Sequence, residues 1–209
     1  ANDPDNTDVV AQCDAAHPTE PATLARCADA LSATGRRDQA ADDARRAWTT
    51  GLDQPTLVAA FLQQWGSKLT PGDEWMRFEN LAWHDPNDAA RQIARLDPAH
   101  RPQAEARLAF QHDASNAAAL LAAAHVTEAG DPGLMLDHAR YLRRAAQLPD
   151  ALALWQAEGA AAQAAIQATE PGRLPIFWTE RNLLARALLA AGDAKGAYAL
   201  CDAAGQTAP

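Results

Sequence analysis

The chain of 209 residues contains 53 Ala but only four Val and three Ile, and 48% of its residues are hydrophobic. Alanine is the strongest helix former and β-branched residues favour strands, so this composition excludes a sheet-rich fold. A net charge of −9 argues against binding to nucleic acids or to anionic lipids, because both require a clustered basic surface.

Helix boundaries are marked by capping signals along the chain. An Asp or Thr followed by Pro, as at Thr70, Asp85, Asp97 and Asp131, offers a side-chain oxygen at the N-cap and a proline that needs no N–H partner. Between these marks the apolar residues recur at helical spacing. In chain order, the predicted helices span residues 5–16, 21–34, 36–50, 54–65, 71–83, 86–96, 99–112, 115–126, 132–146, 149–157, 159–168, 175–191 and 193–204.

These helices, joined by short turns, predict an all-α fold. Similar turn-and-helix segments follow Gly35 and Gly192, but their irregular intervals argue against a strict tetratricopeptide array and favour a looser solenoid. We therefore expect a right-handed superhelix of antiparallel helical hairpins, with about twelve or thirteen helices in a single domain over residues 1–209. Residues 1–50 could form an N-terminal hairpin subdomain within it.

The sequence contains no run of about 18 apolar residues, so it predicts no transmembrane helix and no membrane insertion. No signal peptide is visible. The first six residues are polar and begin with Ala1, which fits either a processed export substrate or a trimmed chain.

Two of the three cysteines lie symmetrically about a turn. Cys13 and Cys27 are equidistant from the turn at residues 18–21. If antiparallel helices flank this turn, the two residues face each other and could form a disulfide. The alternative is that both are small buried hydrophobic residues. Cys201 is left over, and three cysteines are too few for a four-ligand zinc site.

Motifs for catalysis, metal binding or cofactor binding are not found in the sequence. It has no Gly-rich phosphate loop and no nucleophile elbow, and its six His include no His-x-x-x-His pair. His138 lies within an apolar stripe, so we interpret it as a core histidine rather than a catalyst. We therefore expect no catalytic residue, no metal site and no cofactor.

The six Trp residues allow two interpretations. Aromatic faces can stack on sugar rings, but Trp65 and Trp75 lie on apolar helical stripes. Large aromatic side chains also fill the gaps between Ala-rich helices. We therefore expect the Trp residues, including Trp178, to belong to the core.

A series of short segments between residues 40 and 204 carries a family resemblance through its order and spacing. The strongest segment covers residues 177–186 and includes Phe177, Trp178, Glu180, Arg181 and Arg186. Earlier segments cover residues 61–78, 81–83 and 131–144. In this order the chain resembles the N-terminal helical region of soluble lytic murein transglycosylases.

The resemblance implies a non-catalytic α-superhelix beside a lysozyme-like domain that cleaves peptidoglycan. The catalytic Glu of that family is followed by Ser, whereas none of the eight Glu in this chain is. The resemblance therefore predicts a periplasmic scaffold that is not itself an enzyme. This scaffold would position or bind murein glycan strands for a C-terminal catalytic domain missing from this chain.

Two other functions stay open. A freestanding helical-repeat module of the cell envelope would bind a protein or peptide on its concave face. An enzyme could instead assemble its site from dispersed carboxylates, although the Asp and Glu residues fall mostly at caps and on solvated faces.

The last predicted hairpin also carries an expectation about its surface. The helix at 193–204 should bury Tyr198 and Cys201 on its neighbour. The helix at 175–191 has more apolar surface than one neighbour can cover, so we expect exposed apolar side chains there, with Leu188 a candidate.

Overall fold

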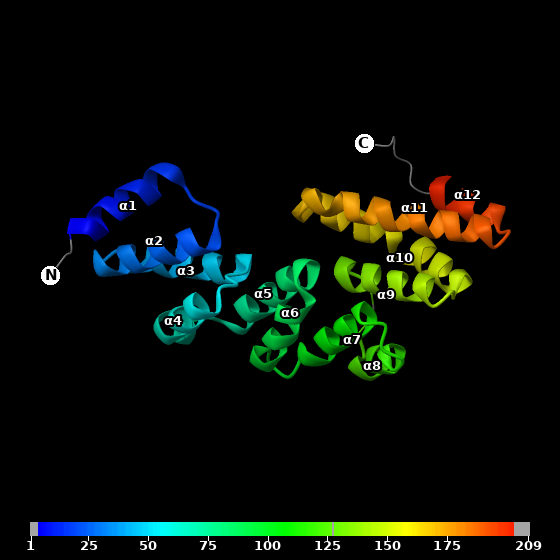
Figure 1. Cartoon of the computed structure of the whole chain (residues 1–209), viewed down its shortest axis with the longest axis horizontal. Coiled ribbons are helices and arrows are strands. Elements are labelled where there is room, and N and C mark those ends of the chain that lie inside the picture. The colour runs from blue at the N-terminus through cyan, green and yellow to red at the C-terminus, as the bar shows by residue number, and fades with distance from the viewer. Residues whose placement is uncertain (1–3, 127, 203–209) are drawn as a thin grey trace. The chain divides into compact units, whose positions relative to one another are not determined.

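The computed structural model describes residues 4–126 and 128–202, and it is helical throughout (Figure 1). Twelve α-helices and three short 3-10 turns occur in this part of the chain, with no strand. The all-α prediction is therefore confirmed. The contacts between residues divide the chain into two compact units, Ala1–Arg101 and Pro102–Pro209. We describe each unit separately. The subdomain boundary expected near residue 50 falls inside the first unit.

The first unit is a succession of helices that pack on their neighbours in the chain. α1 packs on α2, α2 on α3, α3 on α5 and α5 on α6. The helices are α1 (Pro4–Ala16), α2 (Pro21–Ala33), α3 (Arg37–Thr50), α4 (Pro55–Trp65), α5 (Pro71–His84) and α6 (Pro86–Gln92), with 3-10 turns η1 (Gly66–Lys68) and η2 (Ile93–Arg95).

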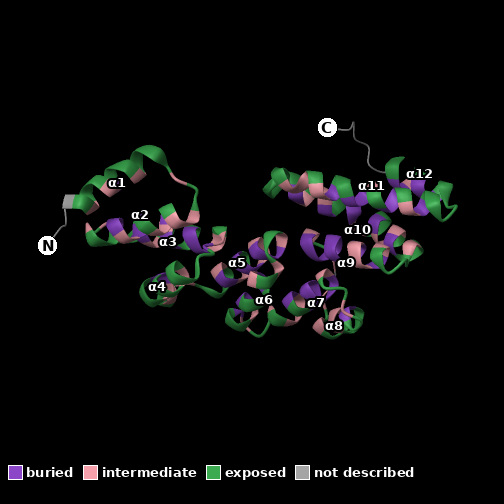
Figure 2. Ribbon diagram, viewed as in Figure 1, coloured by how far each residue is buried: buried purple, intermediate pink, exposed green. Residues whose placement is uncertain are grey.

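The core of the first unit is built from small residues and a few large rings. Figure 2 shows the buried positions along its helices. Alanines on the facing sides of α2 and α3 are fully buried, which lets these two helices approach closely. Trp48 at the end of α3 stacks on Phe61 of α4 with ring centres 5.5 Å apart. Buried alanines thus bring α2 and α3 close together, while aromatic rings join α3 to α4.

Several predicted caps form as expected. Thr70 accepts a hydrogen bond from the backbone N–H of Asp73, and the Asp73 side chain accepts from that of Thr70, which completes a capping box. Asp85 and Asp131 cap α6 and α9. Asp97 was expected to cap a helix, but it lies in a turn. Its side chain accepts from the backbone N–H groups of residues 99 and 100, and α7 begins only at Arg101.

The second unit contains the longer helices. α9 packs on α10, α10 on α11 and α11 on α12, while α11 also contacts α9 and α10 also contacts α12. Its helices are α7 (Arg101–Gln111), α8 (Ala117–Ala124), α9 (Pro132–Arg144), α10 (Leu148–Thr169), α11 (Leu174–Ala190) and α12 (Ala194–Asp202), with 3-10 turn η3 (Pro171–Arg173).

Two groups of aromatic side chains fill this unit. Phe110 on α7 is fully buried and stacks on His138 of α9, with ring centres 4.3 Å apart. Nδ1 of His138 lies 2.6 Å from Oε1 of Glu128, so the histidine is stacked and hydrogen-bonded in the packed part of the unit, as expected. Further along the chain, Trp155 on α10 meets Phe177 of α11 edge to face.

The helix break predicted at residue 158 is wrong. α10 runs unbroken from Leu148 to Thr169. Gly159, the first residue of the second predicted helix, lies inside α10 under the ring of Trp155. The helix predicted over residues 54–65 does end at Trp65, but Gly66 after it has φ −54°, an ordinary right-handed helical backbone, and begins η1.

Apolar side chains are exposed at the C-terminal hairpin, as expected, but at different positions. Leu188 is buried, whereas Leu183, Leu189 and Tyr198 are exposed. The buried face of α12 is Gly196, Ala197 and Leu200 rather than the stripe predicted through Tyr198 and Cys201. Within residues 4–126 and 128–202, no helix has the length and apolar character needed to cross a membrane.

Candidate functional site

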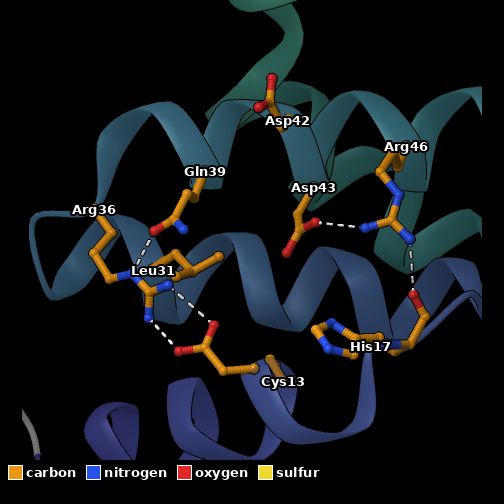
Figure 3. Close-up of a pocket in the computed structure, with 10 residues that line it drawn as sticks. Cys13, His17, Leu31, Arg36, Gln39, Asp42, Asp43 and Arg46 are labelled. Carbon is orange, nitrogen blue, oxygen red and sulfur yellow. Dashed lines mark hydrogen bonds and ion pairs between the residues drawn. The ribbon is translucent and has the colours of Figure 1, made fainter.

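A polar pocket lies in the first unit, where the end of α1, the α1–α2 turn, α2 and α3 meet (Figure 3). Its volume is about 390 Å³. Most of its walls are charged or polar, so it suits a polar ligand better than an apolar one. The lining residues are Cys13, Asp14, His17, Pro18, Leu31, Arg36, Gln39, Asp42, Asp43 and Arg46.

A disulfide fixes two of the helices beside this pocket. Cys13 of α1 and Cys27 of α2 are bonded, and their Cα atoms are 6.1 Å apart. Cys27 is fully buried, whereas Cys201 is a free and exposed thiol. The two cysteines that the sequence placed across a turn therefore meet as a bonded pair.

Two arginines cross the pocket and are engaged by its own walls. Arg36 donates to both carboxylate oxygens of Asp14, at 2.6 and 3.0 Å, and this bond holds the pKa of Asp14 below its usual range. Arg46 donates to Asp43 at 2.9 Å and to the backbone oxygen of Pro18 at 3.0 Å. A ligand would have to compete with these bonds.

The pocket walls carry charged and hydrogen-bonding side chains. Its only sulfur belongs to the disulfide, and no Ser, Thr or Lys lines it. Among residues 4–126 and 128–202, no group of three or more His, Cys, Asp or Glu could hold a metal ion. Sequence reasoning missed the pocket because its walls come from positions 13 to 46, which only tertiary packing brings together.

The residues that carry the family resemblance lie on α11 and divide into a buried and an exposed set. Phe177, Glu180 and Arg181 are buried, whereas Trp178 is 46% exposed and Arg186 is also exposed. The expectation that Trp178 belongs to the core is therefore wrong. Each residue of an α-helix is rotated by about 100° from the one before, so burial of Phe177 turns its neighbour outward.

Glu180 holds α11 to α9 through ion pairs. Its carboxylate accepts from Nε and Nη2 of Arg143, at 2.5 and 3.1 Å, and lies 3.6 Å from Nε of Arg140. A buried carboxylate needs such partners, because burying an uncompensated charge is strongly unfavourable. The role of Glu180 is thus to join two helices.

A second buried carboxylate has the same role in the first unit. Glu74 of α5 accepts from Nε1 of Trp48 at 3.0 Å, from Nε2 of Gln92 at 2.7 Å and from Arg95. Arg77 lies over the Trp48 ring at 3.9 Å and donates to the Trp48 carbonyl oxygen, and burial lowers its pKa to about 10. This network ties α3, α5 and the end of α6 together.

Comparison of the chain with protein-family models, with curated protein sequences and with solved structures gives no significant match.

Proposed function

We propose that this chain is a non-catalytic helical scaffold of the lytic-transglycosylase type. It acts in the periplasm and positions or binds murein glycan strands for a catalytic domain carried outside these 209 residues. The all-helical architecture, in which successive helices pack on one another, is compatible with such a scaffold. In this proposal the hairpins continue as a right-handed superhelix, so that each hairpin buries its face on the next.

The observation that carries the proposal is the exposure of Trp178. In the segment of strongest resemblance, Phe177, Glu180 and Arg181 are used in packing or ion pairing, but the Trp178 indole is 46% exposed. The exposed part of the indole offers a flat aromatic face to a ligand. Sugar rings present apolar C–H faces that stack on indole, so a glycan strand is a suitable ligand.

Co-sedimentation with purified murein sacculi tests the proposal. The wild-type chain should sediment with sacculi, and Trp178→Ala should weaken this binding about tenfold, in line with the effect of truncating a central interface aromatic. Leu189→Ala is a matched control, because Leu189 lies on the same helix and is 57% exposed. The chain alone should release no muropeptides. Absence of binding, or equal binding of the Trp178 variant, would contradict the proposal.

The second candidate function is a protein-interaction module of the cell envelope. It is suggested by the exposed apolar side chains of the last hairpin, Leu183, Leu189 and Tyr198, which an apolar partner surface could cover. Affinity capture from an envelope extract with soluble murein fragments as competitor separates the two. A protein partner that murein does not displace, and that Tyr198→Ala releases, would favour this module.

A further inference from the structure

Two ion pairs share the walls of the polar pocket in the first unit. They are Arg36 with Asp14 and Arg46 with Asp43. Asp42 also lines the pocket, but its carboxylate pairs with Arg45, and Figure 3 shows it pointing away from the other two pairs. The charges that face the pocket are therefore balanced, so a ligand without net charge suits it better than an anion or a cation.

The pair of Arg46 and Asp43 has bonding capacity left over. Nη1 and Nη2 of Arg46 donate to Asp43 and to the backbone oxygen of Pro18, whereas Nε has no acceptor among residues 4–126 and 128–202. Asp43 accepts through Oδ1, and Figure 3 shows its other oxygen turned toward the interior of the pocket. The pair can thus donate one more hydrogen bond and accept another while its own bond stays intact.

His17 supplies a further acceptor. It follows the last residue of α1 with φ 45°, a left-handed backbone that ends the helix. In the view of Figure 3 its ring lies below Asp43, and within the described part of the chain this ring forms no hydrogen bond. The hydrogen bond from Arg36 is the main cause of the lowered pKa of Asp14, and the charge of His17 acts in the same direction. A neutral imidazole has one accepting nitrogen, so His17 can accept from a donor near these carboxylates.

The pocket is accessible to a small molecule from solvent. The side chains of Asp14 and Arg46 are 53% and 52% exposed. The volume of about 390 Å³ lies within the range of small-molecule sites. The free oxygen of Asp43 and Nε of Arg46 therefore lie where a ligand can reach them.

We propose that this pocket binds a small zwitterion of the α-amino acid class. The ammonium group donates to the free oxygen of Asp43 and to the ring of His17, and the carboxylate accepts from Nε of Arg46. A single carbon atom separates the two charged groups of an α-amino acid. Because Arg46 and Asp43 are themselves only 2.9 Å apart, both groups can face this ion pair without breaking it. Charge-assisted bonds of this kind are the strong ones in proteins.

The other end of the pocket indicates the kind of amino acid. Arg36 donates to Asp14 and to the side-chain oxygen of Gln39, so this end presents polar groups to the ligand side chain. A polar side chain can bond there, whereas a large apolar one would cover polar groups without bonding them. The inference does not depend on the murein scaffold proposed above.

Titration of the isotope-labelled chain with the standard L-amino acids, one at a time, tests the proposal by NMR. At least one polar amino acid should bind and shift the amide signals of the α1–α2 turn. Its N-acetyl derivative lacks the ammonium group and its amide lacks the carboxylate, so each should bind at least about tenfold more weakly, the effect of losing one charge-assisted bond. ε-Aminocaproate carries the same two groups farther apart and should bind equally weakly.

Two variants test the residues. Arg46→Gln and Asp43→Asn should each weaken binding of the same amino acid about tenfold or more. The matched controls are Arg45→Gln and Asp38→Asn, which make the same changes at exposed positions of α3 outside the pocket lining and should leave the affinity unchanged. Thermal unfolding checks that each variant folds, and the derivatives test the wild-type chain without any substitution.

Three outcomes would overturn the inference. The first is that none of the standard amino acids binds. The second is that the amide or the N-acetyl derivative binds as tightly as the free amino acid, because the pocket would then recognise only one of the two charges. The third is unchanged affinity of Arg46→Gln, which would place the ligand elsewhere. None of these results bears on the murein scaffold, which sacculus binding tests separately.

Discussion

Gly159 lies directly beneath the indole of Trp155, one helical turn away on α10. A Cβ atom at position 159 would come within 2.6 Å of Cε3 of the Trp155 ring, a distance at which the two atoms overlap. Glycine inside a helix is less favourable than alanine by about 1 kcal/mol. Here it leaves room for the ring to lie flat on its own helix, and this fixes the place where Trp155 meets Arg181 and Phe177.

The first prediction follows from this contact. Gly159→Ala should destabilise the second unit by about 1–3 kcal/mol, the usual effect of overpacking, although alanine has the better helix propensity. Chemical denaturation measures the change. Gly66→Ala is the control, because a Cβ there makes only ordinary contacts at 3.7 Å and the backbone is already right-handed. The control should be neutral or slightly stabilising; a stabilised Gly159 variant would contradict the prediction.

The same glycine lies where one helix was predicted as two. Glycine has a low helix propensity, so the residue type itself gives little support for a continuous helix at this position. What keeps α10 continuous is the packing of Trp155 over Gly159, and nothing in the local sequence indicates where that ring points. Thr70 and Asp85 were predicted correctly because a cap depends on the residues within three positions of it.

The second prediction concerns the buried pair of Arg107 and Asp137. Asp137 accepts from Nε of Arg107 at 2.9 Å and from Nε2 of Gln111 at 2.7 Å. Asp137→Asn removes the negative charge beside a fully buried guanidinium, so it should destabilise the chain by about 3–5 kcal/mol.

A surface pair provides the comparison. Asp113 pairs with Arg144 at 2.7 Å, but the side chain of Asp113 is 52% exposed and that of Arg144 is 34% exposed. Asp113→Asn should therefore change the free energy of unfolding by less than about 1 kcal/mol. Equal effects of the two substitutions in urea denaturation would show that the position of the charge in the core does not matter.

The third prediction concerns the bond between Cys13 and Cys27. Thiol titration of the denatured, unreduced protein should find one free thiol, that of Cys201. Reduction should lower the free energy of unfolding by about 3 kcal/mol, because the sequence separation of 14 closes a short loop. Three titratable thiols in protein prepared under oxidising conditions would refute the bond.

The fourth prediction is a dependence of stability on pH. The hydrogen bond to His138 lowers the pKa of Glu128 from its ordinary value of 4.5. Between the lowered value and 4.5 the unfolded chain binds more protons than the folded one, so stability rises with pH across this window. The contribution of the pair is therefore complete above pH 4.5 and is lost as pH falls through the pKa of the folded state.

Comparison with Glu128→Gln isolates this effect. The difference in the free energy of unfolding between wild type and variant should shrink as pH falls below 4.5. A difference that stays constant down to pH 3 would mean that Glu128 does not titrate with the expected shift.

The candidate site shows where sequence reasoning ends. Cys13 and Cys27 could be paired from the sequence because a single turn separates them. The bond between Arg36 and Asp14 spans 22 residues and two turns, and that between Arg143 and Glu180 spans 37. Arginine and carboxylate residues are common, so the sequence offers many equivalent pairings and only the packing of the helices selects among them.

The last prediction separates the two kinds of tryptophan in the chain. Trp48 is buried, stacks on Phe61, lies under Arg77 and donates its indole N–H to Glu74. Trp48→Ala should therefore destabilise the first unit by about 3–5 kcal/mol, the usual range for a large buried aromatic. Trp178 is half-exposed, so Trp178→Ala should change stability by less than about 1 kcal/mol.

Thermal and urea unfolding measure the stability of the two variants. Co-sedimentation with sacculi then shows whether Trp178→Ala also weakens binding. Near-native stability together with weakened binding would assign Trp178 to ligand recognition. If Trp178→Ala instead unfolds the second unit as severely as Trp48→Ala unfolds the first, its exposed face is incidental. The buried part of Trp178 would then serve the packing of the second unit.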